Sequence, residues 1–162
     1  MARFVMTKKL TNATGALLVI PAQAKFLFRG VIHGDYVSMK NGRRIVTFGN
    51  RFGCIKKQKA LDWEQLAVLQ VPRPKTPFLG LCALMADFHY ARKASDLDEN
   101  LLKDMLQVKK PGKPCCGVIF NDNQIKIHDT RWHLDKLNPR VEFLLMDLAS
   151  YDRLRKDKPD TL

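Results

Sequence analysis

The sequence lacks the motifs that mark several large classes of enzyme and metalloprotein. It contains no Gly-rich phosphate loop and no nucleophile elbow, so neither a P-loop nucleotide site nor an α/β-hydrolase mechanism is indicated. Its four histidines show no ligand or triad spacing, and its four cysteines form no CxxC pair. We interpret the cysteines as reduced and mainly structural, which excludes a zinc site and a disulfide framework: Cys54, Cys82, Cys115 and Cys116.

A long hydrophobic run is also absent. Near the N-terminus, Lys8 and Lys9 precede an apolar stretch, and Ala22-Gln23-Ala24 resembles a signal-peptide cleavage site. The apolar stretch covers only Ala16 to Ile20, which is shorter than a signal h-region, and no other stretch reaches transmembrane length. We therefore expect a cytoplasmic protein without membrane contacts.

Acidic residues are scarce in the N-terminal half. Residues 1–77 carry 14 Lys and Arg against 3 Asp and Glu, whereas residues 78–162 carry 14 against 13. The first half thus contains most of the formal net charge of +12. Such a one-sided excess is typical of a surface that binds a polyanion, and it favours nucleic acid as the partner.

The chain is long enough for one domain with a real core, since it has 162 residues of which 46% are hydrophobic. Apolar patterns predict strands over 25–32, 45–48, 78–88 and 140–148, and helices over 56–69 and 97–108. We expect an α+β domain over residues 25–150, with Trp63 in its core. Residues 1–24 would be a peripheral extension, and residues 151–162 a charged, frayed tail.

Basic residues gather around a predicted β-hairpin. Asn41-Gly42 is a strong hairpin-turn signal, and the strand over 45–48 follows it. A basic hairpin can enter a groove or follow phosphates, and the alternative is an ordinary solvated hairpin. A second group of cations follows the apolar segment 78–88. The candidate DNA-binding residues are Lys40, Arg43, Arg44, Arg51, Arg92 and Lys93.

The acidic residues of the second half include Asp96 and Asp98, in the stretch ASDLDENLLKDML. At the end of a strand, carboxylates two residues apart leave the same face of the sheet. Two anions this close repel, and a cation between them relieves the repulsion; hard oxygen ligands select Mg²⁺ or Mn²⁺. The alternative is that these residues cap the helix that follows, which needs no metal.

A second acidic stretch, IFNDNQ, places Asp122 between the apolar segments 117–120 and 124–128. We predict a β-hairpin with Asn121-Asp122-Asn123 at its turn, folded back beside the first acidic stretch. An Asp in a turn needs no metal, so a purely structural role for Asp122 stays open.

Three blocks of the sequence resemble the RusA-like Holliday junction resolvases, dimeric endonucleases of bacteria and their phages. The blocks are IHGDYVSMKNGRRIV, SDLDENLLKDML and GVIFNDNQI, in the family's order, and similarity runs from about residue 26 to 148. The resemblance implies a small mixed β-sheet with two main helices packed on it, and a homodimer. It also implies symmetric cleavage of branched DNA, such as four-way junctions, with Mg²⁺ (or Mn²⁺ in its place) and no small-molecule cofactor.

Matched by position, the family's metal-binding and catalytic aspartates fall on Asp96, Asp98 and Asp122, and its catalytic lysine falls on Lys103. Asn100 matches the family's signature Asn and is a possible accessory residue.

Two departures from the family pattern concern Glu99 and Asn121. Asn121 stands where the family often has the first of two acids, and it is also a possible accessory ligand. Glu99 is inserted before Asn100. We expect the insertion to be absorbed before the helix begins, which leaves Lys103 one turn in and facing Asp98. The alternative is that Lys103 is only an i, i+4 partner of Glu99.

The expected function is therefore a metal-dependent endonuclease of DNA recombination, repair or replication. The alternative is a junction-binding or single-strand-binding DNA protein of phage replication or recombination that has lost catalysis, of which Asn121 would be a mark.

Overall fold

A computed structural model describes residues 26–38, 43–93, 97–109 and 111–157. No helix within these ranges combines the length and the apolar character needed to cross a membrane. The fold is α+β, as the sequence predicts. In chain order the elements are β1 (Leu27–His33), β2 (Arg43–Phe48), β3 (Arg51–Lys56), α1 (Gln58–Gln70), β4 (Cys82–Tyr90), α2 (Asn100–Leu106), η1 (Asp122–Gln124), β5 (Ile125–Leu134), β6 (Arg140–Asp147) and α3 (Leu148–Lys156).

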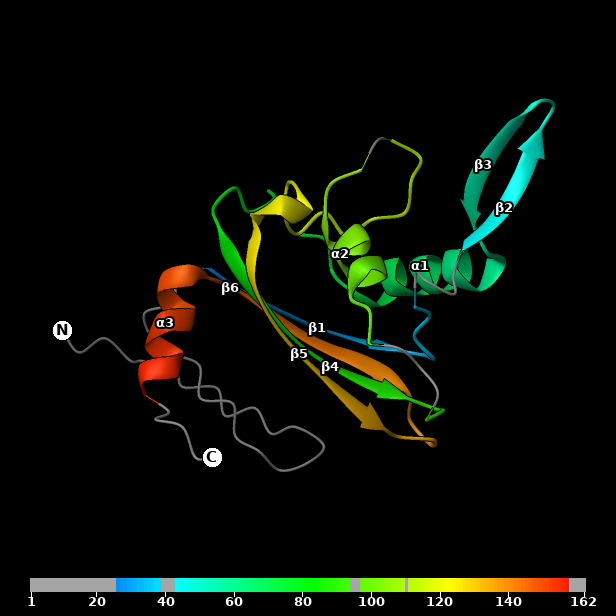
Figure 1. Ribbon diagram of the computed structural model, residues 1–162. Helices are drawn as coiled ribbons and strands as arrows, with labels where there is room; N and C mark the ends of the chain where they lie inside the picture. The colour runs from blue at the N-terminus through cyan, green and yellow to red at the C-terminus, as the bar shows by residue number, and fades with distance from the viewer. Residues whose placement is uncertain (1–25, 39–42, 94–96, 110, 158–162) are drawn as a thin grey trace.

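The main sheet has four strands in the order β1-β6-β4-β5 (Figure 1). Strand β6 pairs antiparallel with β1 and β4, whereas β4 and β5 are parallel, so the predicted mixed sheet is confirmed. The hairpin predicted for 117–120 and 124–128 is wrong. Residues 125–134 pair with β4 instead, and Ile119 makes only isolated bridges to Phe78 and Gln107.

The side chain of Gln124 explains this difference. Its amide nitrogen donates to the carbonyl oxygens of Phe78, at 3.0 Å, and Gly80, at 2.7 Å. These bonds fasten η1 to the segment that leads into β4, and β5 therefore starts beside the start of β4. Such long-range bonds leave no periodic signal in the sequence.

One face of the sheet packs against α1 and α2 (Figure 1). Tyr36 is buried in the core that they form. The Tyr36 ring lies 4.9 Å from Trp63 and 4.8 Å from Phe88, both edge to face. Its hydroxyl accepts a hydrogen bond from the backbone N–H of Leu102 at 3.2 Å, and burial raises its pKa well above the usual value. The predicted core position of Trp63 is confirmed, at 3% exposed.

The other face of the sheet carries a third helix, α3, which the sequence did not predict. Tyr151 of α3 packs on Ala83, Leu144 and Met146. The expectation of a frayed tail is therefore wrong for the residues up to Lys156. A hydrophobic side chain every three or four residues, as in Leu148, Tyr151 and Leu154, was the missed signal.

The side chain of Asp147 caps the N-terminus of α3. The carboxylate of Asp147 accepts hydrogen bonds from the Ser150 backbone N–H at 2.9 Å, the Ser150 hydroxyl at 2.8 Å and the Phe26 N–H at 3.0 Å. Burial alone would raise the pKa of Asp147, but these hydrogen bonds outweigh it and hold the pKa below its usual value. Asp147 thus joins β6, α3 and the start of β1.

We predict that Asp147→Ala lowers the free energy of unfolding at pH 7 by about 1–2 kcal/mol, the usual cost of losing an N-cap. Because the pKa of Asp147 is lowered in the folded state, its stabilisation is present above about pH 4 and is lost as pH falls through the folded pKa. Urea unfolding at pH 7 and pH 3 should show the variant and wild type converging at the lower pH. Asp152→Ala, at an exposed position of α3, is the control; a constant difference at both pH values contradicts the linkage.

Strands β2 and β3 form a separate two-stranded sheet that projects from the domain (Figure 1). The predicted strand over 45–48 is confirmed and extends back to Arg43. Its partner strand starts at Arg51, after a turn at Gly49-Asn50 in which Gly49 has a φ of 58°. The turn at Gly49-Asn50 was not predicted from the sequence, although Gly-Asn is itself a turn signal. The predicted turn at Asn41-Gly42 lies outside the described residues.

The prediction of reduced cysteines agrees with the structure, in which all four thiols are free. Cys54 is exposed on β3, and the other three are buried. Burial raises the pKa of Cys82 to about 11 and that of Cys116 to about 12, so these two thiols are unreactive at neutral pH.

Candidate active site and nucleic-acid interface

Asp98 is buried directly before α2, with 6% of its surface exposed. Its Oδ2 accepts a hydrogen bond from the Ser38 hydroxyl at 3.1 Å, and its Oδ1 accepts from the Asn100 backbone N–H at 3.0 Å and side-chain amide at 2.6 Å. The bond to the Asn100 N–H closes a turn just before α2, but Asp98 is not the N-cap of this helix, so the capping alternative is not met in the form predicted. Asp98 is therefore held rigidly, whether or not it also binds a cation.

Glu99 is the N-cap residue of α2, and the helix begins at Asn100. The prediction that α2 begins after Glu99 thus agrees with the structure, while the family register on which it was based stays a prediction. Lys103 lies one turn in, but its amine pairs with Glu99 Oε1 at 3.2 Å, which is the contact that the structural alternative predicted. The same oxygen lies 2.5 Å from Nδ1 of His128, on the strand β5 beneath α2.

The second carboxylate oxygen of Glu99, Oε2, is buried and has no hydrogen-bond partner among the described residues. A buried carboxylate oxygen without a donor costs free energy, and a cation or an ordered water would remove that cost. Glu99 is therefore a candidate ligand beside Asp98. From the sequence, Glu99 was predicted as an insertion and a possible partner of Lys103 but not as a ligand, although its position next to an Asp-Leu-Asp stretch was a signal.

Nothing in the sequence pointed to His128. Its side chain leaves β5 on the face that α2 covers, because His128 lies opposite Leu84 of the buried face of β4. The ring and the Lys103 amine hold the Glu99 carboxylate from two sides. Only the packing of α2 across β5 brings the three residues together.

Asp122 lies in η1, next to Asn121, which starts this short helix. Oδ1 of Asn121 accepts from the Asn123 N–H at 2.8 Å, and the Gln124 side chain accepts from the Asn121 N–H at 2.8 Å. This reciprocal capping gives Asn121 a structural role that needs no metal. Asp122 itself is half-buried and lies in this 3-10 helix, not in the turn of the predicted hairpin.

The two described aspartates that we predicted as ligands are connected to opposite ends of α2. Asp98 precedes the first residue of the helix. The chain that leads into η1 is bonded to Leu106, the last residue of α2. The backbone N–H groups of Val118 and Ile119 donate to the Leu106 carbonyl at 2.7 and 3.1 Å. The structure thus places Asp98 beside Glu99 and Asp122 farther along α2.

A metal site can be tested against these positions. Within the described ranges, no three His, Cys, Asp or Glu side chains come close enough together to hold an ion. Asp96, the third predicted ligand, lies outside these ranges. By donor chemistry the residues at the start of α2 fit a hard cation, since Asp98 and Glu99 are consecutive carboxylates in the chain and one buried oxygen of Glu99 lacks a donor among the described residues.

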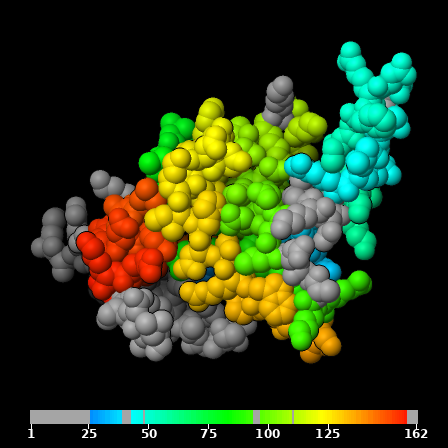
Figure 2. All heavy atoms as spheres, viewed as in Figure 1, coloured from blue at the N-terminus to red at the C-terminus, as the bar shows by residue number. Residues whose placement is uncertain are grey.

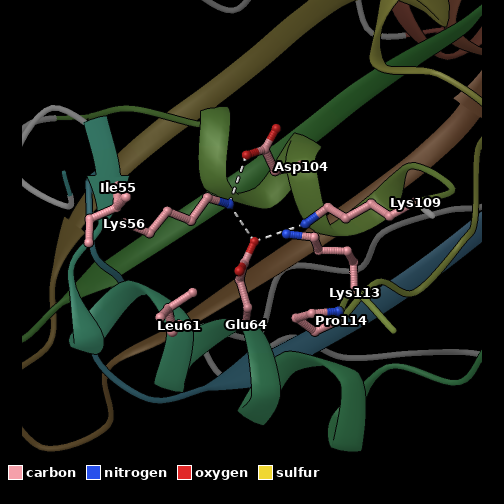
Figure 3. Close-up of a pocket in the computed structure, with 8 residues that line it drawn as sticks. All are labelled: Ile55, Lys56, Leu61, Glu64, Asp104, Lys109, Lys113 and Pro114. Carbon is pink, nitrogen blue, oxygen red and sulfur yellow. Dashed lines mark hydrogen bonds and ion pairs between the residues drawn. The ribbon is translucent and has the colours of Figure 1, made fainter. Parts of the chain in front are cut away.

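A cleft of about 480 Å³ opens where the hairpin joins the domain (Figure 3). Glu64 of α1 is buried at its base, 2% exposed, although the sequence pattern placed the inner face of this helix on apolar residues. Its Oε1 accepts hydrogen bonds from the amines of Lys56 at 2.5 Å and Lys109 at 2.9 Å. Lys56 also pairs with Asp104 of α2 at 3.0 Å, and Lys113 points into the cleft in Figure 3.

This charge cluster fixes the base of the hairpin. Lys56 is the last residue of β3, so its two ion pairs join the hairpin to α1 and α2. Burial alone would lower the pKa of Lys56, but its bonds to Glu64 and Asp104 outweigh this and raise the pKa. Lys56 therefore stays charged at neutral pH.

We predict that Glu64→Gln lowers the free energy of unfolding by about 1–3 kcal/mol, because it leaves two partly buried amines without their shared anion. Asp62→Asn is the matched control, since Asp62 is an exposed acid of the same helix bonded only to Gln58, and its loss should cost less than about 0.5 kcal/mol. Urea unfolding measures both. Equal costs for the two variants would show that the cluster does not stabilise the fold.

The candidate DNA-binding residues that the structure describes are all on the surface. Arg43, Arg44 and Arg51 are exposed on the hairpin, and Arg92 and Lys93 are exposed just after β4. Lys40 lies outside the described residues. Figure 2 shows the hairpin standing clear of the rest of the surface.

Comparison with known proteins assigns the chain to no family. No protein-family model matches it, and no curated protein matches it either. The resemblance to RusA-like resolvases therefore stays a prediction from three short blocks of sequence. Function has to be argued from the site itself.

Proposed function

We propose that the protein is a metal-dependent endonuclease that cleaves branched DNA as a homodimer in the cytoplasm. One observation carries the proposal most directly. Consecutive residues at the start of α2 carry carboxylates: Asp98 is buried, and Glu99 is half-buried with one oxygen, Oε2, that is buried and has no donor among the described residues. Carboxylate oxygens of this kind are ligands that suit Mg²⁺ or Mn²⁺.

The residues around these acids act as positioning groups. Ser38 and Asn100 fix the Asp98 carboxylate, and Lys103 and His128 fix that of Glu99. The family resemblance adds Asp96 and Asp122 to the proposed ligands, and the chain around Asp122 would have to move toward the start of α2 for Asp122 to join Asp98. When bound, the metal would activate water and stabilise the charge that develops on the phosphate.

The basic surface is the proposed binding site for the DNA substrate. Arg43, Arg44 and Arg51 stand exposed on the projecting hairpin, where they can neutralise phosphates. A four-way junction has approximate two-fold symmetry, so a two-fold dimer would present one site to each of two strands.

Asp98→Asn should abolish cleavage while junction binding persists, because the amide removes a ligand charge, keeps the shape and lowers repulsion toward phosphate. A synthetic four-way junction with Mg²⁺ measures cleavage, and a gel-shift assay in EDTA measures binding. Asp152→Asn, an exposed acid on α3, serves as the control and should cleave normally. Wild-type cleavage by Asp98→Asn would remove Asp98 from the site, and an unfolded variant would show that its helix-starting role dominates.

Lys103→Ala separates the two roles of this lysine. If the amine reaches the scissile phosphate or orients Glu99 for catalysis, the cleavage rate should fall by about 10²- to 10³-fold. The free energy of unfolding should change by only a few tenths of a kcal/mol, the value of an i, i+4 ion pair. Single-turnover cleavage and urea unfolding measure the two effects. A normal rate would leave Lys103 as a structural partner of Glu99 alone.

A second function, junction or single-strand binding without catalysis, is favoured by one observation. The amide oxygen of Asn121, where the family often has an acid, is used to cap η1. If this second function is correct, the same Lys and Arg side chains bind DNA, and the wild-type protein shows no cleavage with Mg²⁺ or Mn²⁺.

A further inference from the structure

The hairpin β2–β3 carries exposed apolar side chains that the proposed function has not used. Ile45 is 77% exposed and Phe52 is 82% exposed. In the strand register Ile45 lies opposite Cys54, and Phe52 lies opposite Thr47. Side chains alternate between faces along a strand, so Ile45, Phe52 and the exposed Cys54 share one face of the ribbon.

This face is not part of the domain core. The hairpin forms its own sheet and joins the domain through the Lys56 ion pairs at its base. A two-stranded hairpin alone is marginally stable, so an anchored one that keeps a Phe ring in solvent indicates a ligand for the ring.

The charge around the ring indicates which ligand. Between Asp35 and Asp62 the sequence has seven Lys and Arg and no Asp or Glu. Arg43 lies on the same face as Ile45 and Phe52, and Arg51 precedes Phe52 in the chain and projects from the opposite face of the narrow ribbon. A second copy of the hairpin would bring like charges together, whereas a nucleic acid offers phosphates to the cations and flat bases to the ring.

We propose that the hairpin is a nucleotide-stacking element: Phe52 stacks on an exposed base face, in a single strand or where stacking is interrupted at a DNA branch point, while the neighbouring arginines hold phosphates. Paired bases in a linear duplex are already stacked and leave the ring no partner. The hairpin would thus give preference for branched or single-stranded DNA over duplex. This inference rests on the proposed DNA substrate but not on cleavage.

Binding in EDTA tests the inference without any cleavage. Fluorescence anisotropy would compare a four-way junction, a single-stranded oligonucleotide and a linear duplex. Phe52→Ala and Phe52→Leu should both weaken junction and single-strand binding by about 5- to 150-fold, the effect of losing one stacked base, and leave duplex binding unchanged. Phe52→Trp should keep wild-type affinity because it keeps an aromatic face.

Two controls separate stacking from other effects. Leu137→Ala removes an apolar side chain that is 97% exposed, outside the hairpin, and should change no affinity. Arg51→Ala should weaken binding to all three DNAs and reduce the slope of log affinity against log salt by about one phosphate's contribution.

Several results would overturn the inference. They are wild-type junction affinity for Phe52→Ala, an equal loss on duplex, or wild-type affinity for Phe52→Leu. A change of oligomeric state in Phe52→Ala, measured by light scattering, would instead make the hairpin a self-association surface. If the wild-type protein binds junctions with these preferences but never cleaves them, the stacking role stands and the nuclease proposal fails. If it binds no DNA, both fail.

Discussion

The buried carboxylate of Glu64 is the contact on which the arrangement of the candidate functional surfaces depends. It accepts hydrogen bonds from Lys56, at the end of the hairpin, and from Lys109, after α2. A carboxylate that is 2% exposed is stable as an anion only with such partners. By satisfying Glu64, the two lysines also fix the basic hairpin relative to α2, where the candidate acids begin.

The parallel pairing of β4 and β5 is the second constraint. A parallel pair places the starts of both strands at one edge of the sheet, so η1 and Asp122 lie near the segment that enters β4. The chain between β4 and β5, which includes α2, must therefore cross back over the sheet. This return places Glu99 above His128 and separates Asp98 from Asp122 along α2.

The comparison of Glu99 with Asn121 shows how departures from a family pattern can differ in consequence. Asn121 has a complete local explanation, because its side chain caps η1. Glu99 has only a partial one: Oε1 is paired with Lys103 and His128, and Oε2 is buried without a donor among the described residues. The inserted residue thus adds carboxylate charge at the start of α2, where the resemblance alone suggested only a change of register.

The sequence by itself determined the local elements and the distribution of charge. Apolar spacing over few residues predicted β1, α1, β4 and β6, and the scarcity of acids before Asp62 predicted the basic surface, because these properties depend on near neighbours in the chain. The tertiary structure alone decided the pairing of β5 with β4, the burial of Glu64 and the meeting of Glu99 with His128. Each of these depends on a hydrogen bond or ion pair between residues distant in the chain, and such contacts exist only once the sheet has brought them together.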